Sequence, residues 1–555
     1  MFFQASVVKG LLPVLLAGDV VLAALDGHCP PLGSVLPAPT SPSTHDVIQS
    51  TVAVVKTVFQ ETTSTLNTTG ISLSVKSIHE SSPLLDLHYT PPSLNTSGTT
   101  SIDAQTIYRV GSISKIFPIL ALLTQKSVRL DDPITKYVPE LLQLKGGTDE
   151  VNDITTVQWE HVTLGTLASH MSGIGSDLVS DLASVPANWT QLGLPVLGDE
   201  SKTGCAGVLG LPSCNRTEFF RDFGKRYPVF APFSPNAVYS NVASSILGFA
   251  VEAITNMTYD NFIHQSILAP LGMTNTSIFK PTSQQRLGIH SGREHVVGRY
   301  AGGFYSNTVD LLALGSGILA HRLIDAVTTR KWMKPVTSTS STGLLLGGAL
   351  GDPAFYTKSG NIDAYHNSML ELVPDYDLVV QPRRVRPSPP PSGRCSPRSR
   401  TRARAEAADR ATNSSVTLAA DDDDDHAPGL AVSGWVVDGV DVVANYASFA
   451  ALSSDLAVSA RLYPTGLAAG GRTAWRAVFD VGTPAQLAEK DASACWAKSS
   501  CHTWASMDRL VYGFRSMDEF VFDVGDDDGT AGSLDLRAFH PRQSHEGVLA
   551  PRCQR

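Results

Sequence analysis

The order of apolar and polar positions divides the chain into two parts. In the first part, apolar residues recur with helical spacing over 47–59, 112–126, 241–256 and 259–269. Strand patterns occur at 71–78 and 355–359. This mixture of helices and strands across residues 45–380 indicates a domain of the α/β or α+β class.

The second part has a different texture. Short strand patterns occur at 430–437, 440–449, 456–463, 474–481 and 519–524, and turn clusters with Gly, Asp and Pro separate them. We therefore expect a β-rich domain over 413–555. Between the two parts, residues 381–404 contain eight Arg, six Pro and no acidic residue. Such a composition cannot bury apolar area, so we expect 381–412 to be a linker, either disordered or an artefact of the gene model.

The length and the net charge of the chain exclude several classes of protein. A chain of 555 residues exceeds what one hydrophobic core supports, since single cores stop growing at about 250–300 residues. The net charge of −9 argues against a nucleic acid partner. No apolar run reaches the ~20 residues of a membrane-spanning helix. The sequence leaves the oligomeric state open.

The N-terminus and the glycosylation sequons predict secretion. Lys9 is followed by an apolar run over 11–24, so residues 1–24 are interpreted as a signal peptide. Seven Asn-x-Ser/Thr sequons follow, more than chance predicts for this composition. They lie at Asn67, Asn95, Asn188, Asn215, Asn256, Asn275 and Asn413.

The cysteines favour the same oxidising compartment. Cys205 and Cys214 form one close pair and Cys495 and Cys501 another, and we interpret both pairs as disulfides. The pairing of Cys29, Cys395 and Cys553 stays open. No Cys-x-x-Cys and no His-Glu-x-x-His occurs, so we predict neither a metal nor a cofactor.

Ser112 and Lys115 are the first candidates for chemistry. They lie three residues apart at the start of a predicted helix, which places both side chains on one face. A serine there can be a nucleophile and the lysine its general base, if burial or a nearby cation keeps the lysine neutral. The backbone N–H of Ser112 can help to bind an oxyanion. The pair alone is more typical of a helix cap followed by a solvated lysine.

Two further segments favour the catalytic interpretation. Tyr239 and Asn241 precede an apolar helical run about 125 residues after Ser112. The tyrosine can carry a proton to a leaving group, and the asparagine can hold Lys115. A strand that ends in the sequence Lys358, Ser359, Gly360, Asn361 can line the other side of a site. There Lys358 would add positive charge, Gly360 would permit close approach, and the N–H of Asn361 would be the second oxyanion donor.

These three segments, in this order, resemble the class C serine β-lactamases and their relatives with the penicillin-binding-protein fold. The flanking sequences at 130–133, 137–141, 162–173, 268–274 and 301–306 agree with that family. The resemblance covers about 45–380 and looks closest to secreted fungal β-lactamase-like proteins with a β-rich C-terminal domain. It implies an α+β catalytic domain in which an antiparallel sheet, backed by helices, faces a helical subdomain.

Two features depart from the family. Pro118 falls inside the helix of the nucleophile, where a proline removes a backbone hydrogen bond and bends the helix. The strand at 377–380 runs directly into the Arg/Pro segment, where the family continues with another strand and a helix. Both features favour a catalytically decayed protein.

The resemblance implies a secreted serine hydrolase that forms an acyl-enzyme. Its substrate would be a small molecule or peptide with an ester or amide bond, and a true β-lactam is less favoured. Two alternatives stay open. One is acyl transfer to a small-molecule alcohol, as in the lovastatin-type acyltransferases of the same fold. The other is a catalytically decayed binding protein. An α/β-hydrolase is not favoured, because the chain has no Gly-x-Ser-x-Gly.

Secretion and glycosylation can be tested together. We expect the secreted protein to lack residues 1–24 and to carry N-glycans on several of the seven sequons. Intact mass before and after glycosidase treatment measures both. Retention in the cytosol, or an unchanged mass after the enzyme treatment, would contradict the expectation.

Overall fold

The computed structural model describes most of the chain between Pro37 and Gln554. The residues not described are 1–36, 95–97, 149, 178–180, 206–210, 213, 235, 282–298, 335, 337–355, 363–365, 385–402, 421–428, 451, 453–455, 484–506, 525–530, 540–549 and 555. The signal peptide therefore lies outside the described residues. Within them, no helix is both long and apolar enough to cross a bilayer.

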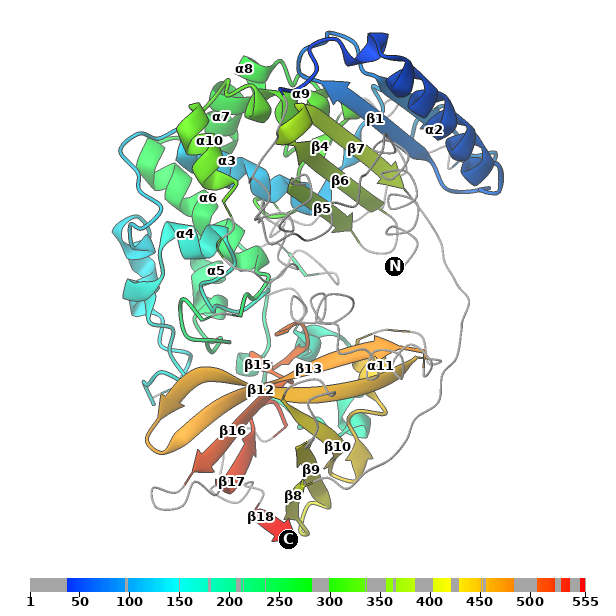
Figure 1. The fold of residues 1–555 in the computed structure, drawn as a ribbon. Coiled ribbons are helices and arrows are strands. Elements are labelled where there is room, and N and C mark those ends of the chain that lie inside the picture. The colour runs from blue at the N-terminus through cyan, green and yellow to red at the C-terminus, as the bar shows by residue number, and fades with distance from the viewer. Residues whose placement is uncertain are drawn as a thin grey trace, which may run out of the picture.

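A five-stranded antiparallel sheet forms one side of the first domain (Figure 1). Its order across the sheet is β2 (Leu85–Tyr89), β1 (Ile71–Ser77), β7 (Leu378–Arg384), β6 (His366–Val373) and β5 (Tyr356–Ile362). Helix α9 (Thr308–Leu319) packs closely on this sheet. A Cβ at Gly315 of α9 would lie only 2.5 Å from the Val379 side chain. The predicted antiparallel sheet backed by helices is confirmed.

A helical subdomain packs beside this sheet and contributes most of the largest apolar core. The predicted helices at 112–126, 241–256 and 259–269 all occur in it, and the first of them begins with a 3₁₀ turn. The helix predicted at 47–59 is α2, which lies beside β2 instead. The helices are α2 (Asp46–Ser64), α3 (Ile116–Leu123), α4 (Leu164–Ala168), α5 (Arg216–Phe223), α6 (Asn241–Thr255), α7 (Tyr259–Ile263), a π-helical turn (His264–Leu268), α8 (Ala269–Leu271) and α10 (Ala326–Trp332).

The predicted β-rich domain is a nine-stranded antiparallel sheet, drawn below the first domain in Figure 1. The sheet curls so that the strands at its two ends, β17 and β18, contact each other. In order, the strands are β17 (Ala531–Leu536), β16 (Glu519–Val524), β13 (Arg472–Gly482), β12 (Ala457–Ala469), β10 (Leu430–Val437), β9 (Ser414–Ala420), β8 (Ala403–Asp409) and β18 (Ala550–Gln554), with β11 (Val440–Asp441) beside β10.

The expectation of an unstructured linker over 381–412 is wrong at both ends. Residues up to Arg384 continue β7, which pairs with β1 along its whole length. The Arg-rich sequence does not prevent backbone pairing with β1. Pro382 interrupts the pairing only on the side of β7 that faces β6. There the pairs with β6 stop at Ser368 and resume at Glu371, because a proline has no N–H to donate. Strand β8 then opens the second sheet before residue 413.

The strand predicted at 440–449 is also wrong beyond Asp441. The Asp441 carboxylate accepts a hydrogen bond from the Ala444 N–H at 2.9 Å, which turns the chain. The short helix α11 (Tyr446–Phe449) follows. An aspartate side chain competes with the strand ladder for backbone donors, so the apolar pattern alone was misleading here.

The two domains share apolar cores. Residues 181–197 of the first domain extend into the second, where Leu182 and Leu194 pack in the same cluster as Trp435 and Phe520. A second cluster joins Phe230 of the first domain to β13, and a third joins Ile154 to β12, β13 and β16. The interface is therefore built like a protein interior, with buried side chains from both domains.

Leu194 tests this shared core. It is 2% exposed, so Leu194→Ala should lower the free energy of unfolding by about 2–5 kcal/mol through lost contacts and a cavity. The measurement is the thermal midpoint, with Leu142→Ala as the control because Leu142 is 53% exposed. Equal midpoints for the two variants would show that the extension does not support the second domain.

Candidate active site

Ser112 lies on a tight turn between strand β3 (Tyr108–Arg109) and helix α3. The turn is a 3₁₀ helix, Gly111–Lys115, in which residues three apart lie directly above one another. Ser114 Oγ donates a hydrogen bond to the Gly111 carbonyl at 2.7 Å and stabilises the turn. Ser112 is partly exposed, whereas Lys115 is completely buried beneath it.

Pro118 does not distort this turn. The α-helix begins only at Ile116, so Pro118 occupies its first turn. The backbone N–H groups of a first turn have no partner within the helix, so the proline removes no helical hydrogen bond there. The expectation that Pro118 bends the nucleophile's helix is therefore wrong, and with it one argument for a decayed site.

Lys115 Nζ contacts three oxygen atoms. It lies 3.0 Å from Ser112 Oγ, 2.7 Å from Asn241 Oδ1 and 2.8 Å from the Ala301 carbonyl oxygen. A neutral amine has two N–H donors and one lone pair. The two carbonyl oxygens can only accept, so they take both donors and leave the lone pair for the Ser112 hydroxyl.

Asn241 and Tyr239 come from the start of α6. Ser240 caps this helix: its Oγ accepts from the Ala243 N–H at 2.9 Å. The Asn241 amide donates to Asp177 Oδ2 at 2.8 Å, which orients its oxygen toward Lys115. Tyr239 shares a hydrogen bond with Ser112, and Lys115 Nζ lies 4.7 Å from the centre of its ring. The predicted grouping of these side chains is found.

Strand β5 closes the other side of the site. Lys358 Nζ lies 5.4 Å from the centre of the Tyr239 ring and donates to the Ser359 carbonyl at 2.6 Å. The Ser359 side chain points outward and is exposed. A Cβ on Gly360 would lie 2.0 Å from the Val110 carbonyl and 2.8 Å from the Ser112 nitrogen. Glycine is thus required for the strand to reach the Ser112 turn.

The same close approach brings the two expected oxyanion donors near each other. Gly111 has φ +53°, and a Cβ built on it would lie 3.0 Å from the Asn361 nitrogen. The Asn361 nitrogen therefore lies beside the Ser112 turn. Two backbone N–H groups at one point can stabilise negative charge that develops on a carbonyl oxygen.

Burial sets the protonation of the site. The pKa of Lys115 is lowered well below its usual value by burial and by the positive charges of Lys358 and Arg509, while Asp177 acts in the opposite direction. Burial also lowers the pKa of Lys358 to about 7. It raises the pKa of Tyr239 to about 12, so the phenol stays protonated at neutral pH. The site therefore combines a neutral amine with a protonated phenol.

The sequence analysis missed four residues of this site. The His170 ring packs against the Tyr239 ring at 4.6 Å between ring centres, with the planes tilted by 40°, and burial lowers the pKa of its imidazole well below the usual value. Asp177 holds Asn241, and the Ala301 carbonyl holds Lys115. His170 and Ala301 lie in segments that carried the family resemblance, which was a usable signal. Arg509 belongs to the C-terminal domain, and no sequence pattern marks it.

The remaining predicted sites are the disulfides and the glycosylation sequons. The structure contains the Cys205–Cys214 disulfide. Cys495 and Cys501 lie outside the described residues, as do Cys29, Cys395 and Asn95. The exposed sequon asparagines are Asn67, Asn188, Asn215, Asn256 and Asn413, and Asn275 is partly exposed.

Two family models match the chain. The one described as "Beta-lactamase" matches residues 72–381. The one described as "Beta-lactamase-like-like, C-terminal domain" matches residues 407–544.

Individual proteins agree with these families. A "Beta-lactamase-like protein" of Arthroderma benhamiae is 28% identical over 352 residues, covering 60% of this chain and 57% of its own length. A "Probable hydrolase M10" of Phoma sp. is 27% identical over 314 residues, covering 51% and 49%. The chain thus spans about half the length of these curated relatives. A class C beta lactamase structure from Rhodobacter sphaeroides has 18% identity and a TM-score of 0.41, covering 61% of this chain and 94% of that one.

Gly360 provides a test of the site's packing. Gly360→Ala places a Cβ 2.0 Å from the Val110 carbonyl, so we expect the free energy of unfolding to fall by about 1–3 kcal/mol. Denaturant unfolding measures this. Gly532→Ala is the matched control on a strand, because a Cβ there would have its nearest neighbour at 3.7 Å. If both variants are as stable as the wild type, strand β5 does not pack on the Ser112 turn as described.

Proposed function

Since the chain belongs to the beta-lactamase family, whose members include hydrolases, we propose that it is a secreted serine hydrolase acting through an acyl-enzyme. The observation that carries the proposal is the environment of Lys115. This buried amine has two carbonyl acceptors and one serine hydroxyl, and no carboxylate among the described residues contacts it. Such an amine is suited to accept a proton rather than to form an ion pair.

The first half-reaction forms the acyl-enzyme. Ser112 Oγ attacks the carbonyl carbon of the substrate, and its proton passes to Lys115 Nζ. The carbonyl oxygen becomes an oxyanion held by the N–H groups of Ser112 and Asn361. As the tetrahedral intermediate collapses, the proton passes through the Tyr239 hydroxyl to the leaving oxygen or nitrogen, and the carbon–leaving group bond breaks.

The second half-reaction releases the acid. A water molecule attacks the acyl carbon and gives a proton to the same base. The bond to Ser112 Oγ then breaks, and the serine recovers its proton. The substrate class we propose is a small ester, amide or peptide. Among the relatives, a "Probable hydrolase M10" and a "Putative D-alanyl-D-alanine carboxypeptidase" support hydrolysis and an amide-bond substrate respectively.

The proposed roles of Ser112 and Lys115 can be separated by mutation. A fluorophosphonate probe should label the wild type, and Ser112→Ala should abolish the labelling. Lys115→Met keeps most of the side-chain volume and removes the amine. We therefore expect turnover of a chromogenic ester to fall about 10²–10⁴-fold with the thermal midpoint retained. The measurement is kcat/KM over a panel of ester, amide and β-lactam substrates.

Tyr239→Phe isolates the proton transfer to the leaving group. The ring and its packing against His170 remain, so only the hydroxyl is lost. The loss should be larger for amides than for activated esters, because a phenolate leaving group needs no proton. Wild-type turnover in Ser112→Ala would contradict the proposed function, and a folded wild type that takes no probe and cleaves no panel member would favour a binding protein.

A further inference from the structure

Part of the active-site wall comes from the C-terminal domain. Arg509 lies just before strand β14 (Val511–Tyr512), and its guanidinium carbon is 5.6 Å from the centre of the Tyr239 ring. The Nε of Arg509 is buried and has no hydrogen-bond partner within the described residues. A side chain from a different domain thus reaches the tyrosine that contacts the nucleophile.

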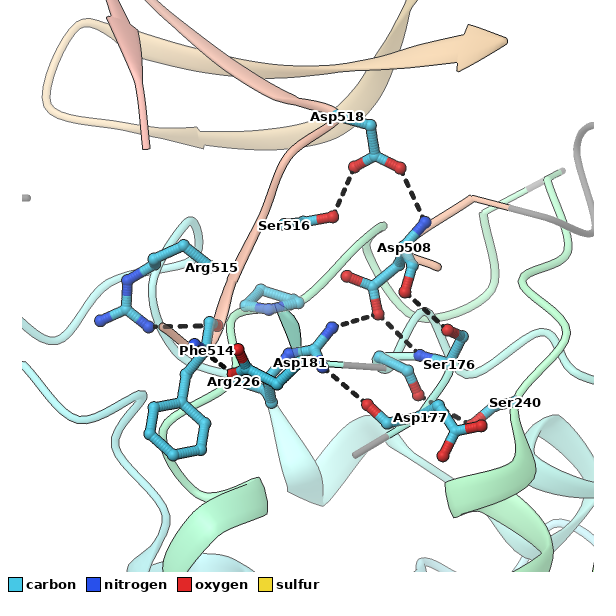
Figure 2. Close-up of polar contacts among 12 residues, drawn as sticks. Ser176, Asp177, Asp181, Arg226, Ser240, Asp508, Phe514, Arg515, Ser516 and Asp518 are labelled. Atoms are coloured by element: carbon cyan, nitrogen blue, oxygen red, sulfur yellow. Dashed lines mark hydrogen bonds and ion pairs between the residues drawn. The ribbon is translucent and has the colours of Figure 1, made fainter. Parts of the chain in front are cut away.

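The residue before it, Asp508, anchors this approach. Asp508 Oδ2 pairs with Arg226 Nη2 at 2.5 Å and accepts from the Ser176 N–H at 2.7 Å. The Asp508 carbonyl accepts from Ser176 Oγ, also at 2.7 Å. Figure 2 shows these contacts between the two domains. Asp508 and Arg226 are buried, at 1% and 4% exposure.

The partners of Asp508 are the same groups that hold the catalytic asparagine. The Ser176 carbonyl accepts from the Asn241 N–H at 2.8 Å. Arg226 Nη1 donates to the Asp177 carbonyl at 2.6 Å, and the Asp177 carboxylate holds the Asn241 amide. A continuous chain of hydrogen bonds therefore connects Asp508 to Asn241 and so to Lys115.

The C-terminal domain holds Asp508 rigidly from its own side. Asp518 Oδ2 accepts from the Asp508 N–H at 2.7 Å, and Asp518 Oδ1 accepts from Ser516 Oγ at 2.6 Å. Arg476 of β13 pairs with Asp518 at 2.7 Å and donates to the Pro228 carbonyl of the first domain at 2.9 Å. All of these polar contacts are buried. They hold the backbone at Asp508 in place, and so they fix the point from which the Arg509 side chain extends.

We propose that the C-terminal domain completes the active site, with Asp508 as the anchor and Arg509 as a positioning residue that fixes the Tyr239 ring and adds positive charge beside Lys115. The inference rests on the proposed function, because it assigns Arg509 a role in the same proton transfer. It also gives the C-terminal domain a direct part in the chemistry of the first domain.

The charges around Lys115 explain why a guanidinium is useful there. Lys358, Arg509 and Asp177 face Lys115, and the neutral His170 packs against Tyr239. Lys358 has a pKa of about 7, so its charge disappears as the pH rises above neutrality. A guanidinium stays charged over that range and continues to favour the neutral form of Lys115.

The test is the pH dependence of kcat/KM for p-nitrophenyl acetate between pH 4 and 10. Arg509→Met removes the charge but keeps the bulk. The pKa of Lys115 should rise, so the acid limb should move to higher pH by about one unit, which is roughly a tenfold loss on that limb. The loss of kcat/KM in Arg509→Met should come mainly from a lower kcat, with KM little changed. Arg509→Lys should restore the wild-type limb, because it keeps the charge.

Two further variants complete the design. Asp508→Asn breaks the pair with Arg226 and should shift the limb in the same direction, whereas Arg410→Met removes an exposed arginine of the same domain and should change nothing. If Arg509→Met does not fold, as judged by its thermal midpoint, Arg509→Gln takes its place. The inference is overturned if the acid limb of the pH profile stays at its wild-type position in Arg509→Met or Arg509→Gln. It is also overturned if the wild-type profile has no acid limb. Turnover in Ser112→Ala would instead overturn the proposed function.

Discussion

The structure depends on one buried ion pair, between Arg226 of the first domain and Asp508 of the second. Removing one partner of such a pair typically costs about 3–5 kcal/mol, because the other charge stays buried and unpaired. Here the desolvation of Asp508 is offset by two hydrogen bonds from Ser176 to its carboxylate and carbonyl. These partners also hold the loop that supports Asn241. Domain contact and active-site geometry therefore share one set of interactions.

The second constraint is the burial of Lys115. A lysine without exposure is normally unfavourable, since desolvation penalises its charged form. Burial and the neighbouring cations Lys358 and Arg509 lower the pKa of Lys115 and so favour its neutral form. The neutral amine is also the form that can take a proton from Ser112. The environment that makes Lys115 costly as a charged residue is the one that makes it useful as a base.

The shared apolar cores hold the two domains together. Leu182 and Leu194 pack inside the second domain, and Ile154 packs against β12, β13 and β16. Directional hydrogen bonds across this interface, from Gly513 and Phe514 to the Asp181 carboxylate, fix the orientation of the loop that contains Asp508. Burial of apolar side chains stabilises the interface but does not favour one orientation of the domains. The buried hydrogen bonds fix that orientation, because they require a specific geometry.

The sequence by itself predicted α2, α3, α6 and α7, several of the strands, and the residues that act through local spacing. Ser112 and Lys115 share a face because they are three apart, and Gly360 precedes Asn361 on one strand. The tertiary structure determined the role of each residue that depends on contacts with residues distant in sequence. Pro118 is harmless because of where the α-helix begins, and Pro382 is accommodated within β7 because the strand pairs with β1. Asp177 and Arg509 reach the site through contacts that no local pattern encodes. Hydrogen bonds and charge effects act over a few ångströms of space, so residues distant in sequence enter them only once the chain has folded.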